Sequence, residues 1–138
     1  MNTKLYTKVL ALAKGLMEAA EKNNEPFFYR QYDQLKVLCE ENEKGRKNHP
    51  VQWETLADFT EETEDAIRYY DKALELAEGI SAHDYIASIC CSKATMLREC
   101  GEREKALEAV LYAEEHALKE DDKELKEEIA ALIEALQS

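Results

Sequence analysis

The side chains of this sequence best suited to chemistry are its cysteines and histidines. They are Cys39, Cys90, Cys91, Cys100, His49, His83 and His116. A structural zinc site normally shows paired ligands at short spacing, and no C-x-x-C pair occurs here. Because Cys90 and Cys91 are adjacent, they would point about 100° apart on a helix. We predict no metal site, and expect most thiols to be buried as small hydrophobic side chains. Cys91 would be redox active only if it were exposed beside a cation that lowers its thiol pKa.

Two acidic runs, Glu61–Asp65 and Glu120–Asp122, are the other candidates for catalysis. General acid–base catalysis needs carboxylates in a pocket that displaces their pKa values. Both runs instead lie where helices are expected to begin, and there carboxylates interact favourably with the helix dipole. The sequence also lacks a calcium-binding loop, a glycine-rich phosphate loop and a nucleophile elbow. We therefore predict a protein that is not an enzyme and carries no cofactor.

The charge of the chain restricts its partners. Its 138 residues include 18 basic and 30 acidic side chains, which gives a net charge of −12. Nucleic acids and anionic membranes attract basic surfaces, so neither is an expected partner. The charge is also uneven, +2 over residues 1–50 and −14 over residues 51–138. The acidic part favours solubility or, in a sharper interpretation, a basic protein or peptide partner.

We expect neither a signal peptide nor a membrane-spanning segment in this sequence. No apolar run approaches the roughly 18 residues of a membrane-spanning helix. Lys14 interrupts the apolar stretch Val9–Ala13, and no clear cleavage site follows it, so we expect no signal peptide. We expect a cytoplasmic protein of a bacterium.

Apolar residues recur with helical spacing along the chain. Leu125, Ile129 and Leu132 are one example, at i, i+4 and i+7. No stretch alternates with period two for long enough to indicate a strand. We predict an all-α protein of about seven helices, at residues 3–22, 25–44, 50–60, 63–78, 82–100, 103–119 and 122–137. The short linkers predict antiparallel neighbours.

Capping and breaking residues mark the expected helix ends. Expected starts carry a capping residue, followed by Pro or by an acid three residues on. These capping residues are Asn24, Asn48, Ser81 and Asp121. Expected ends carry a glycine. These glycines are Gly45, Gly79 and Gly101.

Two of the expected helices share an internal pattern. Ala66 and Ala73 are seven residues apart, as are Ala106 and Ala113. Alanines at i and i+7 lie on one helix face and allow a neighbouring helix to approach closely. Between them, Tyr70 or Val110 would fill the gap between layers. The pattern predicts two similar helix-hairpin units.

On these residues the chain resembles the tetratricopeptide repeat (TPR) family. Residues 65–76 are similar to the second helix of such a repeat, and Cys90, Ala94 and Leu97 match its first helix. The spacing of 40 residues between Ala66 and Ala106 exceeds the usual period of about 34 and is similar to the longer variants of the family.

The resemblance divides the chain as one TPR-like domain over residues 1–138. It implies repeat units at 50–79 and 82–119, and a capping helix at 122–137. Residues 1–47 fit only as a degenerate helix pair. The resemblance implies a concave groove lined by the first helix of each unit.

The groove face should carry the residues that contact a partner. In the best-matched unit these are Ser88, Cys91, Thr95 and Arg98. Cys91 and Thr95 stand where one branch of the family uses Lys and Asn to hold a terminal carboxylate, so a C-terminal carboxylate ligand is not expected here. Exposed aromatic side chains would be further anchors, because aromatics dominate interface hot spots. The aromatic candidates are Phe27, Tyr29 and Tyr69.

We therefore expect a non-catalytic adaptor or scaffold that binds a partner protein segment in a helical groove. One alternative is a small acidic chaperone for secreted or unfolded client proteins. Another is a self-assembling structural protein in which the last helix pairs between chains. The sequence leaves monomer and homodimer open.

Overall fold

The computed structural model describes residues 3–138, and within this range the chain forms seven α-helices and no strand. The helices are α1 (Thr3–Glu21), α2 (Glu25–Glu41), α3 (Pro50–Asp58), α4 (Thr63–Gly79), α5 (His83–Glu99), α6 (Arg103–Ala117) and α7 (Lys123–Gln137). Every end lies within three residues of its predicted position. The predicted all-α fold class is confirmed.

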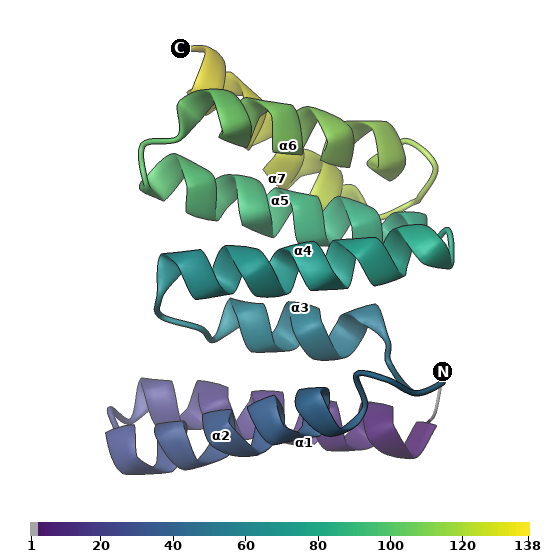
Figure 1. Ribbon diagram of the computed structural model, residues 1–138. Helices are drawn as coiled ribbons and strands as arrows, with labels where there is room; N and C mark the ends of the chain where they lie inside the picture. The colour runs from purple at the N-terminus through teal and green to yellow at the C-terminus, as the bar shows by residue number, and fades with distance from the viewer. Residues whose placement is uncertain (1–2) are drawn as a thin grey trace.

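The helices form a stack of antiparallel hairpins with α1 and α7 at opposite ends (Figure 1). The odd-numbered helices touch one another: α1 contacts α3, α3 contacts α5, and α5 contacts α7. The even-numbered helices do not. Within the described range, no Cα atom of α2 lies within 8 Å of one in α4, and the same holds for α4 and α6. The odd-numbered helices therefore form a closely packed layer. The even-numbered helices form a splayed layer, in which open furrows separate neighbouring helices.

The repeated alanines sit at the closest helix contacts. Ala66, Ala73, Ala106 and Ala113 are all 0% exposed. Tyr70 and Val110 are buried between them, as the spacing predicted. Because each alanine side chain is a single methyl group, the neighbouring helix approaches without leaving a void.

Helix starts follow the predicted chemistry only in part. The Asn24 side chain accepts a hydrogen bond from the Phe27 amide. At α3 the N-cap is His49 rather than the predicted Asn48, because the His49 ring accepts from the Val51 amide at 3.1 Å. The Asn48 side chain is used elsewhere, since its carbonyl oxygen accepts from the Trp53 indole at 2.7 Å.

At the two later starts the cap lies one residue beyond the predicted one. Ala82 precedes α5 and offers no side-chain cap. Ser81 instead follows the end of α4 with a positive φ of 51°. At α7 the capping side chain is Asp122, which accepts from the Leu125 amide at 3.0 Å.

Three helices end in a residue with left-handed backbone. Gly101 has φ +81° after α5, Ser81 has φ 51° after α4, and Asn23 has φ 53° after α1. In each case the following amide bonds back to a carbonyl five residues earlier, as with Glu102 to Leu97 at 2.9 Å. These are Schellman ends.

The short helix α3 shapes the even-numbered face. It has nine residues, whereas α2 and α4 on either side have 17 each. It is almost wholly buried, with Trp53 and Leu56 in the core. In Figure 1, α4 extends beyond both ends of α3.

Candidate interaction surfaces

The face predicted to bind a partner, formed by the odd-numbered helices, holds an unexpected carboxylate. Ser88 donates a hydrogen bond of 2.6 Å from α5 to Glu54 on α3. Loss of water around the half-buried Glu54 carboxyl raises its pKa to about 7, and the nearby Asp58 and Asp84 add to the rise. The Ser88 hydrogen bond acts in the opposite direction. Ser88 is thus engaged within the chain, and Glu54 is a titrating group that the sequence analysis missed.

Cys91 is not on the surface of this face. Its residue is 2% exposed, and burial raises the pKa of its thiol to about 12. The Thr95 hydroxyl donates to the Cys91 carbonyl at 3.0 Å. Thr95 and Arg98 are exposed. Of the four predicted groove residues, only these two present a free surface to a partner, and their role stays a prediction.

A second carboxylate on α3 is tied to α4. Asp58 accepts a hydrogen bond of 2.6 Å from the Tyr70 hydroxyl. Neighbouring side chains desolvate this carboxyl and raise its pKa, although the residue as a whole is exposed. The pKa of Tyr70 is raised as well, first by its own burial and then by Asp58. At neutral pH the hydroxyl is therefore a hydrogen-bond donor that holds α3 against α4.

The buried thiols are in their unreactive, protonated form. Burial raises the pKa of Cys39 and of Cys90 to about 12, as it does for Cys91. A thiolate is the reactive form of cysteine, and at neutral pH these three side chains are protonated. The condition set for redox activity of Cys91, exposure beside a cation, is not met. Cys100 is exposed.

Two histidines form a pair across a hairpin. The Nδ1 atoms of His83 on α5 and His116 on α6 lie 2.8 Å apart, so one nitrogen donates its proton to the other. Burial lowers the pKa of His116, and the nearby His83 lowers it further. Next to them, Tyr112 donates to Glu78 at the end of α4 at 2.6 Å. The ends of three helices are joined here.

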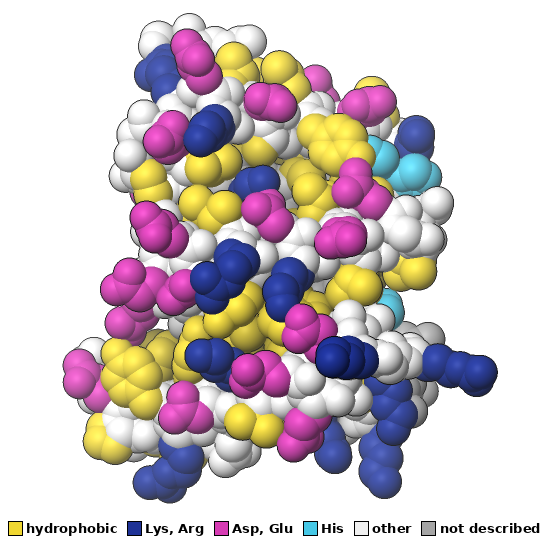
Figure 2. Space-filling view, viewed as in Figure 1, with side chains coloured by type: hydrophobic (Ala, Val, Ile, Leu, Met, Phe, Trp, Pro, Cys, Tyr) yellow, Lys and Arg dark blue, Asp and Glu magenta, His cyan; other side chains and the backbone are white. Residues whose placement is uncertain are grey.

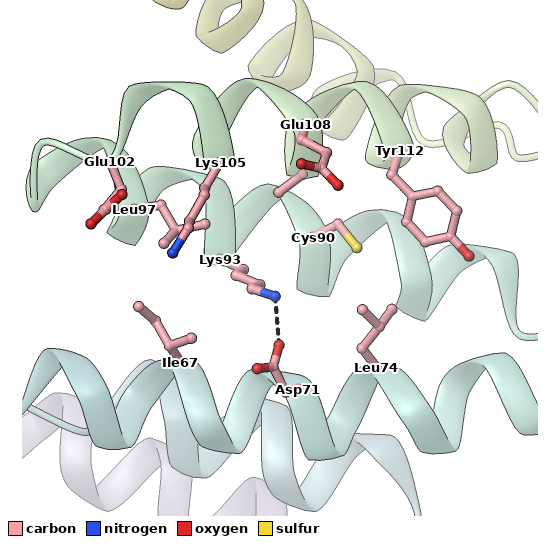
Figure 3. Close-up of a pocket in the computed structure, with 11 residues that line it drawn as sticks. Ile67, Asp71, Leu74, Cys90, Lys93, Leu97, Glu102, Lys105, Glu108 and Tyr112 are labelled. Atoms are coloured by element: carbon pink, nitrogen blue, oxygen red, sulfur yellow. Dashed lines mark hydrogen bonds and ion pairs between the residues drawn. The ribbon is translucent and has the colours of Figure 1, made fainter.

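The splayed layer opens a furrow between α4 and α6 whose floor is α5. This cavity, here called the α4–α6 furrow, has a volume of about 580 Å³. Its apolar walls are Ile67, Leu74, Leu97 and Ala109. In Figure 3, Ile67, Asp71 and Leu74 point from α4 toward α5 and α6, and Tyr112 stands at one end.

An ion pair crosses the middle of this furrow. The Lys93 ammonium lies 2.5 Å from the Asp71 carboxylate, and the Lys93 side chain is 23% exposed. Lys93 lies on the floor of the furrow, which α5 forms. The furrow is therefore apolar along its walls and charged at one central point.

Two of the three predicted aromatic anchors, Tyr29 and Tyr69, line a pocket between α2 and α4. Tyr29 is 45% exposed, and its hydroxyl donates to both carboxylate oxygens of Glu61 at 3.0 and 3.1 Å. Phe27 is half-buried. Tyr69 is 6% exposed, so it is a wall rather than a protruding anchor. Figure 2 shows hydrophobic side chains in the hollow between α2 and α4, with basic and acidic side chains around its rim.

Other kinds of site find no support in the described residues. Over residues 3–138, no group of three or more His, Cys, Asp and Glu side chains is arranged to hold a metal ion. None of the helices in that range is long and apolar enough to cross a membrane. Comparison of the chain with protein-family models, curated proteins and solved structures gave no match.

Proposed function

We propose that the chain is a TPR-like interaction module that holds a segment of a partner protein in the α4–α6 furrow. The proposed activity is binding alone. The observation that carries it is the furrow itself, a preformed cavity of about 580 Å³ on the splayed face of a helical stack. Helical-repeat proteins bind other proteins on their extended concave surface, and the proposal places binding here on the opposite, splayed face.

The furrow has the build of a docking site for a peptide segment. Ile67, Leu74 and Leu97 offer apolar contact that a partner's aliphatic side chains would bury. Tyr112 closes one end through its hydrogen bond to Glu78. Because α4, α5 and α6 are held by buried alanine contacts, the cavity exists before the partner arrives, and binding does not bear the entropy cost of forming it.

The Lys93–Asp71 ion pair would fix the position of a bound segment along the furrow. A partner segment that buries the furrow also desolvates this ion pair, and a desolvated charge must be hydrogen-bonded. The segment therefore needs a polar group opposite Lys93 and apolar groups on either side. An unrelated apolar sequence would leave the pair unsatisfied, so the pair favours specificity over affinity.

The test uses the full chain as bait in a lysate of the cells that make it. A captured protein is identified, purified, and titrated by calorimetry against the native chain and two variants. Ala109→Trp fills the furrow, and Thr95→Trp adds the same bulk on the odd-numbered face. We expect Ala109→Trp to weaken binding at least about tenfold and Thr95→Trp to leave it unchanged.

The opposite pattern would move the binding site to the odd-numbered face that includes Thr95 and Arg98. Equal binding to both variants would remove the furrow from the interaction, and no specific partner would refute the proposal. Circular dichroism confirms that each variant folds. The order or disorder of the free partner then separates an adaptor from a chaperone for unfolded clients.

A further inference from the structure

A small aromatic pocket lies apart from the α4–α6 furrow, between the start of α2, the end of α3 and the first turn of α4. Its volume is about 240 Å³, below the roughly 300–1,000 Å³ of a pocket for a drug-sized ligand. Its aromatic walls are Phe28, Tyr29, Tyr32, Phe59 and Tyr69. The pocket is of a size for one side chain.

Charge at the mouth of this pocket is negative. The carboxylates of Glu61, Glu62 and Asp65 line it together with the cation of Lys36, and Arg68 beside the pocket pairs with Asp65, which leaves one carboxylate in excess. Figure 2 shows Asp and Glu side chains gathered at the turn between α3 and α4, facing hydrophobic side chains at the start of α2. An anionic occupant would be repelled, and an aliphatic one would desolvate carboxylates without pairing them.

The walls are held in place before any ligand binds. Phe28 meets Phe59 edge to face, with ring centroids 6.3 Å apart. The Tyr32 hydroxyl lies 2.7 Å from the Thr60 hydroxyl, which joins α2 to the end of α3. A ligand in this pocket meets fixed ring faces rather than mobile side chains.

Two cationic side chains of the chain itself lie against aromatic rings, one beside this pocket and one farther along the same face. The Arg68 guanidinium lies 5.2 Å from the centroid of Tyr69 and 3.1 Å from Asp65. Farther along the same α2–α4 hollow, the Lys72 ammonium lies 4.4 Å from the Trp53 ring and 2.6 Å from a Glu43 oxygen. Both show a cation held between an aromatic face and a carboxylate.

We propose that the pocket binds the guanidinium of an arginine side chain on the partner protein. The planar guanidinium stacks on aromatic rings and pairs with carboxylates, which is the combination this pocket presents. The inference rests on the proposed function and names the partner's chemistry. Because the pocket and the furrow flank the same helix, α4, one partner segment that crosses α4 fills both. The partner therefore carries an arginine next to its apolar residues.

The pocket is tested with a small probe that does not require the partner. N-acetyl-arginine methylamide is titrated into the isotopically labelled full chain, and backbone and aromatic NMR signals are followed. We expect saturable shifts at Tyr29, Phe59 and Asp65. N-acetyl-citrulline methylamide has the same shape without the charge, and should bind at least about fivefold more weakly. Added salt should weaken binding of the arginine probe.

Variants locate the site. Glu61→Gln should weaken binding of the arginine probe severalfold, whereas Glu124→Gln, which makes the same charge change on the exposed first turn of α7, should not. Equal binding of citrulline, of the lysine analogue or of N-acetyl-leucine methylamide would overturn the arginine assignment. Shifts remote from the pocket, or none at tens of millimolar probe, would overturn the site. These outcomes leave the Ala109→Trp result unaffected, so failure of the pocket is distinguishable from failure of the proposed function.

Discussion

Glu54→Gln should stabilise the protein, and the gain should grow with pH. The carboxyl group of Glu54 lies half-buried between α3 and α5, and burial raises its pKa from the ordinary 4.5 to about 7. The folded state therefore binds this proton more tightly than the unfolded state. The associated stability is fully present below pH 4.5 and is lost as pH rises through 7.

The size of the effect follows from the shift. A difference of about 2.5 pKa units corresponds to roughly 3 kcal/mol once the carboxyl is fully ionised. Between pH 5.5 and pH 8.5, about 2 kcal/mol of this is lost. Glutamine has the same size and still accepts the Ser88 hydrogen bond, but it carries no charge. The stability difference between variant and native chain should therefore rise by about 2 kcal/mol over that range.

Urea unfolding at several pH values measures this difference. The fluorescence of Trp53, the one tryptophan of the chain, reports loss of the core, and circular dichroism reports loss of helix. The lower limit of pH 5.5 keeps the protein above its isoelectric point of about 4.7. Glu127→Gln on the exposed side of α7 is the matched control and should show no such trend. A constant offset across the pH range would refute the buried-charge reasoning, and a uniform loss of stability would show that Ser88 needs a carboxylate.

Three further outcomes are expected. Ser81→Gly should raise the free energy of unfolding by about 0.5–1 kcal/mol, because glycine adopts the positive φ of 51° without the steric cost of a Cβ atom; an unchanged or lower melting temperature would contradict this. Ala73→Leu should lower the free energy of unfolding by about 1–3 kcal/mol, because the Ala73 methyl group is 0% exposed and a larger side chain would clash with the neighbouring helix. An unshifted urea midpoint would contradict this tight contact. The lowered pKa of His116 means that stability is lost as pH falls below its ordinary 6.5, because the unfolded state binds the proton more tightly. His116→Asn should lose less stability on acidification than the native chain, and an equal loss would show that protonation of His116 is not the cause.

Local patterns were sufficient to predict the helices and the tight contacts between them. Helical periodicity is a property of neighbouring residues, so the seven helices could be placed within three residues of their ends. The Ala66–Ala73 spacing needed no knowledge of the partner helix, because only a small side chain permits close approach. Helix caps were less predictable. Asn24 caps α2 as expected, but Asn48 does not cap α3, because its side chain accepts a hydrogen bond from the Trp53 indole instead.

Which side chains are covered, and where a cavity opens, was decided by the tertiary structure. Periodicity marks an apolar stripe but does not say which neighbour covers its edge, so Cys91 and Tyr69 proved to be buried. Glu54 looks like any surface acid until Ser88, 34 residues away, packs against it. The shortness of α3 was predicted from the sequence. The furrows open between the even-numbered helices because the odd-numbered helices touch, and those contacts depend on distances between helices that no single helix encodes.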